Sequence, residues 1–284
     1  MKTNHIYNEN CLETMKKMPE GLLDMTLAGP PYDDLREYNG YVFDFEPIAK
    51  ELYRVTKDGG VVVWIVADAI VDGSESGTSF EQALYFKKIG FRLHDTMIYE
   101  KLGGTLNKGT RYNQTFEYMF VFSKGSPKTV NLIRDKKNKH AGKTSWGDSK
   151  VRKRDGSLVS KKKKPYAEYG IRTNIWRYAR GFNLSTQDTI AFQHPAIFPE
   201  KLVCDHILSW SNKGDLVYDP FMGSGTTAKM CLLNDRAYIG SEISSEYCDL
   251  IEERLSSLLV YENQMSEKEE PPSEITLSDL LRTQ

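Results

Sequence analysis

The sequence predicts an α/β fold built on a doubly wound parallel sheet, with one basic, loop-rich insertion. Short apolar runs rich in β-branched residues alternate along the chain with amphipathic segments, as strands and helices alternate around such a sheet. Two turns, at 29–32 and 219–227, follow apolar runs directly. A lysine-rich stretch without clear periodicity, 124–180, separates the two ordered parts.

Strands are expected where apolar runs are short and end at a turn. The run "VVVWIVAD" at 61–68 is continuously apolar, which is typical of a parallel strand covered on both faces. The remaining expected strands are 23–28, 91–101, 115–124, 215–219 and 237–242.

Helices are expected where apolar residues recur every three or four positions. In 45–60, Ile48, Leu52 and Val55 share one face, and a pair of glycines ends the pattern. The remaining expected helices are 79–90, 198–211, 226–234 and 246–259.

Length and composition set the organisation of the chain. Its 284 residues suffice for one large domain with an insertion. We expect a first half at 1–123, a basic insertion at 124–180, a second half of the same domain at 181–260 and an acidic, mobile tail at 261–284. The four cysteines are scattered, so reduced thiols are expected and a metal site is not. No run approaches a membrane span and no signal region opens the chain, so a cytoplasmic protein is expected.

The net charge of −1 conceals a strong asymmetry. Residues 124–180 hold 18 lysines and arginines against 4 acids, whereas the rest of the chain holds 20 against 35. Such a segment favours a polyanion, and aromatic residues interleaved with the bases favour a nucleic acid. These aromatic residues are Trp146, Tyr166, Tyr169, Trp176 and Tyr178. The alternative is a solvated, lysine-rich loop.

The stretch "AGPPYDD" at 28–34 forms the first turn. Proline has no amide hydrogen and a fixed φ, so the chain must leave the sheet there as a stiff, extended turn. A rigid carbonyl beside the ring of Tyr32 suits a flat molecule whose edge donates a hydrogen bond. A structural turn with a packing tyrosine is the alternative.

The second turn, "LVYDPFMGSGTT", runs from a strand through glycines into a helix. Gly223 and Gly225 allow a ligand close to the backbone, and Glu242 ends the next strand, where a ribose diol is usually held. The turn lacks the lysine of a nucleoside triphosphate site, and Asp219 at its start favours a cationic or zwitterionic ligand. S-adenosylmethionine fits this description, and a plain packing turn is the alternative.

Taken together, these motifs resemble those of the S-adenosylmethionine-dependent amino-methyltransferases of DNA. "DPFMGSGTTA" and "IGSEIS" resemble their cofactor motifs, "GPPY" resembles their catalytic [DNS]PPY motif, and "HPAIFPEKL" at 194–202 resembles their HPxxxP motif. The catalytic motif precedes the basic insertion and the cofactor loop, as in the permuted β group of the family. The resemblance covers about 5–124 and 170–258.

The resemblance implies a Rossmann-like methyltransferase sheet and an enzyme that methylates a base flipped out of double-stranded DNA. The base would stack beside Tyr32, and the carbonyl of Pro30 would accept a hydrogen bond from its exocyclic amino group. The implied catalytic residues are Gly29, Pro30, Pro31 and Tyr32. The implied cofactor residues are Asn10, Asp219, Phe221, Gly223, Ser224, Gly225, Thr226, Thr227 and Glu242, with His194 and Pro195 in the pocket wall. The implied DNA contacts are Lys161, Lys162, Lys163, Lys164, Arg172 and Arg177.

Gly29 departs from the motif, because its first residue usually carries a side-chain acceptor. A water, Asp33 or Asp34 could replace that acceptor, the enzyme could be slow, or chemistry could be disabled while binding is kept. Serine suits an extended residue before proline, so we expect the fold to tolerate it at position 29.

The residues that follow the motif resemble those of SPPY enzymes, so cytosine N4 is the favoured target. Three alternatives stay open: adenine-N6 methylation of DNA, an RNA or protein methyltransferase, and a DNA-binding protein that has lost catalysis. In the second class the cofactor loop usually comes first, unlike here. A homodimer, a cognate restriction endonuclease and a bacterial or phage source are further expectations from the resemblance.

Overall fold

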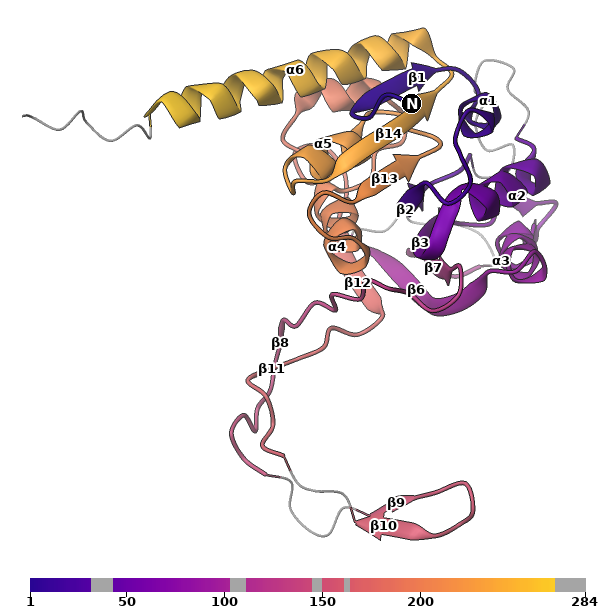
Figure 1. The fold of residues 1–284 in the computed structure, drawn as a ribbon, viewed down its shortest axis with the longest axis vertical. Coiled ribbons are helices and arrows are strands. Elements are labelled where there is room, and N and C mark those ends of the chain that lie inside the picture. The colour runs from indigo at the N-terminus through magenta and orange to yellow at the C-terminus, as the bar shows by residue number, and fades with distance from the viewer. Residues whose placement is uncertain (32–42, 103–110, 145–149, 161–163, 269–284) are drawn as a thin grey trace, which may run out of the picture.

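The structure is a computed structural model that describes residues 1–31, 43–102, 111–144, 150–160 and 164–268, with 259–268 described by backbone alone. Eight strands form its central sheet in the order β1-β14-β13-β2-β3-β7-β6-β12 (Figure 1). Their bounds are β1 (His5–Asn8), β2 (Leu23–Ala28), β3 (Thr56–Val66), β6 (Arg92–Leu102), β7 (Phe116–Ser123), β12 (Ile175–Ala179), β13 (Leu216–Asp219) and β14 (Ala237–Glu242).

The expected doubly wound sheet is confirmed, with one strand reversed. β7 runs antiparallel to both of its neighbours, β3 and β6, and the other neighbouring pairs are parallel. No helical pattern separates β6 from β7, and strands joined without a crossover helix pair antiparallel.

Helices cover both faces of the sheet (Figure 1). On one face lie α1 (Cys11–Lys16), α2 (Phe45–Val55) and α3 (Thr78–Lys88), packed on an apolar cluster that includes Trp64 and Phe122. On the other lie α4 (Glu200–Trp210), α5 (Thr226–Leu232) and α6 (Ser245–Lys268), packed on a second cluster that includes Ile65 and Met119. Side chains on a strand alternate between the faces, so each strand contributes to both clusters. Among the described residues, no helix is both long and apolar enough to cross a membrane.

Small elements complete the described fold. The 3₁₀ helix η1 (Thr189–Gln193) precedes α4, and the hairpin of β4 (Ile70–Val71) and β5 (Ser74–Glu75) precedes α3. In the insertion, β8 (Lys136–Lys137) pairs with β11 (Tyr169–Gly170), and β9 (Lys150–Arg152) pairs with β10 (Leu158–Ser160). These four strands lie away from the central sheet (Figure 1).

The predicted C-terminal boundary of the insertion, residue 180, is wrong, because β12 belongs to the central sheet and pairs with β6. Trp176 and Tyr178 on this strand are buried in the core beneath α4, so they do not offer the stacking faces that the sequence predicts. Tyr166 and Tyr169 are exposed as expected, and Trp146 lies outside the described residues. The strand pattern of β12 is hard to see in the sequence, because only alternate residues face the core and basic residues surround and interrupt them.

Two further boundaries differ from the prediction. α2 ends at Val55, and the glycines expected to end it lie inside β3, where Gly59 has φ +83° and the pairing with β2 shifts register. α6 continues to Lys268, so 261–268, predicted as the start of a mobile tail, are helical. Residues 269–284 lie outside the described part of the chain.

Candidate active site

One cavity of about 710 Å³ lies at the carboxyl ends of β2, β13 and β14, where the two predicted turns meet. Ligands of doubly wound sheets bind at this edge. We call the part lined by 219–224, 226–227 and Glu242 the glycine-turn end; Gly225, predicted as a cofactor residue, does not line it. The part lined by Gly29, Pro30 and Pro31, together with Tyr99, Lys101 and Glu117, is the proline-turn end.

At the glycine-turn end, Gly223 and Gly225 have φ +53° and +78°, in the left-handed region that favours glycine. A Cβ on Gly225 would lie 2.7 Å from Cγ2 of Ile251 on α6, and one on Gly223 would lie 3.1 Å from the ring of His194. Both glycines are therefore required by backbone conformation and by close packing.

Asp219 ends β13 and is buried. Its Oδ1 accepts a hydrogen bond from Phe221 N at 2.9 Å, and its Oδ2 accepts one from Thr227 Oγ1 at 2.5 Å. Burial, with a contribution from the charge of Glu242, raises the pKa of Asp219 to about 7 against the effect of these bonds. Asp219 therefore braces the turn from inside, which the sequence analysis did not predict.

Glu242 ends β14, as predicted, and lines the cavity. Its Oε2 accepts a hydrogen bond from Gly223 N at 2.8 Å, and its Oε1 accepts one from Ser244 N at 3.0 Å. Burial raises its pKa, and the backbone bonds oppose that shift. A carboxylate has about four acceptor positions, so Glu242 can still accept bonds from a ligand diol.

The other predicted cofactor residues fall into two groups. Phe221, Ser224, Thr226 and Thr227 line the cavity, and the ring of Phe221 packs edge-on against Phe43 at 5.8 Å between centroids and Trp64 at 6.2 Å. Asn10 does not line it. Its Oδ1 accepts a hydrogen bond from Leu12 N and caps α1, so the structure supports a helix-capping role for this residue.

The segment between η1 and α4 closes one side of the cavity. His194 and Pro195 line the wall, as the sequence predicts. The His194 ring packs edge-on against Tyr247 of α6 at 4.5 Å, and its Nδ1 lies 2.7 Å from the carbonyl oxygen of Ala196.

Phe198 of the same segment reaches the proline turn. A Cβ on Gly29 would lie 2.3 Å from Cζ and 2.5 Å from Cε2 of this ring. The backbone of Gly29 is not left-handed, as expected, but serine fits only if the Phe198 ring moves, so the expected tolerance of serine stays a prediction that depends on this ring. Tyr32, Asp33 and Asp34 lie outside the described residues.

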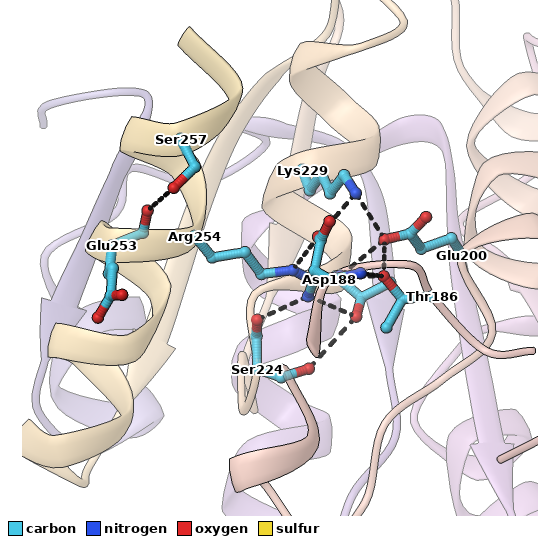
Figure 2. A network of polar contacts seen from close by, with 9 residues as sticks. Thr186, Asp188, Glu200, Ser224, Lys229, Glu253, Arg254 and Ser257 are labelled. Atoms are coloured by element: carbon cyan, nitrogen blue, oxygen red, sulfur yellow. Dashed lines mark hydrogen bonds and ion pairs between the residues drawn. The ribbon is translucent and has the colours of Figure 1, made fainter. Parts of the chain in front are cut away.

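A buried network of charges supports the glycine turn from behind (Figure 2). Arg254 of α6 donates to the carbonyl of Ser224 at 2.8 Å, to Asp188 at 2.8 Å and to Glu200 at 2.7 Å. Lys229 of α5 donates to the same two carboxylates, at 2.7 and 2.8 Å. Desolvation raises the pKa of Asp188. Hydrogen bonds and opposite charges from Lys229 and Arg254 outweigh this effect, so the pKa is lowered overall. The network ties α4, α5 and α6 to the turn.

The predicted DNA contacts differ in their surroundings. Lys164 is exposed, and Lys161, Lys162 and Lys163 lie outside the described residues. Arg177 is exposed and donates to Glu100 at 2.6 Å. Arg172 is half-buried between Asp205 at 2.7 Å and Asp135 at 2.5 Å, with its guanidinium over the ring of Trp176. These partners favour an internal role for Arg172 over a phosphate contact.

Several cavity residues were not predicted from the sequence. They are Tyr99, Lys101, Glu117, Arg180, Phe182, Phe192, Phe198 and Tyr247. Only Phe198 had a signal, because it lies inside the HPxxxP segment. The others lie on strands, loops and helices whose sequences do not indicate which residues meet at the sheet edge.

Comparison with known proteins agrees with this geometry. The family model N6_N4_Mtase, described as DNA methylase, matches residues 23–253. The chain is 60% identical over 247 residues to the orphan methyltransferase M.BamHII of Bacillus amyloliquefaciens, covering 87% of this chain and 93% of that protein. It is 27% identical over 259 residues to the DNA adenine methyltransferase YhdJ of Escherichia coli strain K12, covering 85% and 79%. The solved PvuII DNA methyltransferase, cytosine-N4-specific, matches with a TM-score of 0.64 and 19% identity, covering 87% and 84%, and shares the fold.

Proposed function

The chain belongs to the DNA methylase family of N6 and N4 enzymes, and we propose that it methylates the N4 atom of a cytosine flipped out of duplex DNA. It is an S-adenosylmethionine-dependent DNA amino-methyltransferase. The choice of cytosine over adenine and the roles of individual residues are the proposal.

The observation that carries the proposal is the shared cavity. Its glycine-turn end has the features of a nucleoside site, and its proline-turn end presents the backbone of Gly29, Pro30 and Pro31. A methyl donor and an amino acceptor held in one cavity react as neighbours, and positioning of this kind accounts for much of the rate of a transfer reaction.

The residues at the glycine-turn end fit S-adenosylmethionine. Glu242 keeps acceptor positions for the ribose hydroxyls, and Gly223 brings its backbone to the cavity wall without a side chain. Ser224 and Thr226 add hydroxyls to the cavity wall, and Phe221 adds an apolar ring. When bound, the cofactor supplies a methyl group activated on a sulfonium and leaves as a neutral thioether.

At the proline-turn end, the protein must make an exocyclic amino group nucleophilic. The lone pair of that nitrogen is delocalised into the base, and acceptors that hold its hydrogens make it more available. The carbonyl of Pro30 is one such acceptor, fixed by the rigid turn. We assign stacking of the base to Tyr32, which lies outside the described residues.

The ring of Phe198 supports the choice of cytosine. The ring occupies the space that the Cβ of any larger residue at position 29 would need, and so it narrows the proline-turn end of the cavity. A pyrimidine is smaller than a purine, so a narrowed pocket favours cytosine. The resemblance of 29–41 to SPPY enzymes points the same way.

The basic insertion supports binding to the phosphate backbone. Its hairpin of β9 and β10 carries exposed basic residues at Lys150, Arg152, Lys153 and Arg154. The exposed Lys164 follows in the next described segment. Lysine and arginine bind DNA mainly through phosphates, which fixes the register of the protein on the duplex. A homodimer and a cognate endonuclease stay predictions; the relative at 60% identity is named an orphan methyltransferase.

Nucleoside analysis tests the proposal. Unmethylated DNA is incubated with the protein and labelled S-adenosylmethionine, digested to nucleosides and separated. We expect label in N4-methylcytosine. Label in N6-methyladenine would contradict the assignment of cytosine.

A further inference from the structure

An ion pair forms part of the wall at the proline-turn end. Lys101 Nζ on β6 lies 3.0 Å from Glu117 Oε1 on β7, and their side chains are only 15% and 12% exposed. Both line the same cavity as Gly29, Pro30 and Pro31. Removing two charges from water is costly, so the pair gains little net stability from its own attraction.

The register of the strands places this pair on the face that the reaction uses. Leu27, Met97 and Met119 lie in the apolar cluster beneath α4. Side chains alternate along a strand, so Gly29, two residues beyond Leu27, and Glu117, two residues before Met119, share that face. Tyr99 lies opposite Glu117 in the pairing of β6 with β7 and belongs to the same cluster. Burial and the charge of Glu117 raise the pKa of Tyr99, against the effect of Arg180, so its hydroxyl keeps its proton.

The distance between the strands limits which groups can reach the amino group. β3 alone lies between β2 and β7, and neighbouring strands are about 4.8 Å apart, so the two strands are roughly 10 Å apart. Two acceptors that share one amino group lie only about 5 Å apart, because each lies about 2.9 Å from the nitrogen, so on the β7 side the acceptor must be a side chain that extends into the cavity. Gly29 contributes no side-chain acceptor, and the Phe198 ring occupies the space beside it, so a side chain on the other side of the cavity is placed to supply one.

We propose that Glu117 is the second acceptor for the target amino group, opposite the Pro30 carbonyl, and that Lys101 positions its carboxylate. This rests on the proposed function. A carboxylate accepts several hydrogen bonds at once, so Glu117 can bind Lys101 and the amino group together. The ammonium of Lys101 has three donors and can also reach the acceptors beside the amino group on a cytosine edge.

The proton balance of the reaction assigns Glu117 a second task. The amino nitrogen uses its lone pair to form the new bond to the methyl carbon, as the bond from that carbon to sulfur breaks with its electrons left on sulfur. The nitrogen then carries one proton too many. Glu117, already bonded to that hydrogen, takes the proton and passes it to water when the product leaves.

Single-turnover methyl transfer to unmethylated DNA tests the role of Glu117, with cofactor affinity measured by calorimetry for each variant. We expect Glu117→Ala to lower the rate constant about 100-fold, by analogy with the loss of one oxyanion donor, and to leave cofactor affinity nearly unchanged. We expect Glu117→Gln, which keeps the shape and one acceptor oxygen, to lower it about 10-fold. An alanine variant within about threefold of the parent would overturn the proposal; if it does not fold, the glutamine variant decides on the same criterion.

Lysine variants test the positioning role. We expect Lys101→Met to slow transfer and Lys101→Arg to restore most of the rate. The matched control is Lys57→Met, which removes a lysine paired with Asp24 at 2.6 Å at the opposite edge of the sheet. Equal rates for Lys101→Met and Lys57→Met would overturn the role of Lys101.

The identity of the methylated nucleoside shows whether the role of Glu117 or the assignment of cytosine has failed. If the parent forms N6-methyladenine, the assignment of cytosine fails, but the rates of the Glu117 variants still decide whether this residue holds the amino group. If the parent transfers no methyl group to any DNA, both proposals fail together.

Discussion

The two ends of the cavity are built in different ways. At the glycine-turn end, the polar groups are buried and already paired within the protein: Asp219 and Glu242 bind the turn, and Arg254 supports it from behind. At the proline-turn end, aromatic rings, one ion pair and the Pro30 backbone line the wall. The first end is held in shape by bonds within the protein, and we expect the second to bind the target base.

The largest expected effect concerns the support of the glycine turn. Arg254→Met leaves the half-buried Asp188 with Lys229, and the half-buried Glu200 with Lys229 and Thr186, as remaining partners in the network. Breaking a buried ion pair by removing one partner costs about 3–5 kcal/mol of unfolding free energy. Denaturant unfolding measures this loss, and Arg92→Met, which removes an exposed arginine bonded to Ser126, serves as the control. Equal stability of the two variants would show that the network does not brace the turn.

The basic hairpin of β9 and β10 should contribute to DNA affinity but not to cofactor affinity. Replacing Lys150, Arg152, Lys153 and Arg154 by alanine should weaken DNA binding about 100-fold at low salt and reduce the salt slope, because each phosphate contact contributes about 0.9 to that slope. Cofactor affinity should not change. Binding titrations over a range of salt concentrations measure both quantities, and an unchanged slope would show that the hairpin is a solvated loop.

Gly29→Ser tests the packing of the proline-turn end. The added Cβ must displace the Phe198 ring, and overpacking of this kind costs about 1–3 kcal/mol. Adding Phe198→Leu should restore part of the lost stability, since the shorter side chain leaves room for the serine. Unfolding of the two single variants and the double variant measures the coupling, and strictly additive effects would argue against the contact.

The smallest expected effect is a dependence of stability on pH. The pKa of Asp219 is raised to about 7 in the fold, so the folded state binds more protons than the unfolded state from about pH 4 to 7. Its contribution to stability therefore falls as pH rises through that range. Asp219→Asn should remove this decline, which unfolding at pH 5 and pH 7.5 would show as a smaller difference than in the parent.

Local patterns predicted the framework and both turns. The run "VVVWIVAD" and the glycines of 219–227 are contiguous signals, and the sheet and cavity edge follow from them. The charge network could not be predicted, because Arg254 and Asp188 lie 66 residues apart and meet only when α6 packs beside η1. The pair of Lys101 and Glu117 likewise depends on the antiparallel pairing of β6 with β7, which brings the strands into register.

Calorimetric titration of S-adenosylmethionine into the protein without DNA tests the central claim most directly, that the glycine-turn end is a preformed cofactor site. We expect the parent to bind the cofactor and Glu242→Ala to bind it about 100-fold more weakly, because the ribose loses a charged acceptor and Gly223 N loses its partner. Unchanged affinity in Glu242→Ala, or binding by the parent only when DNA is present, would contradict it.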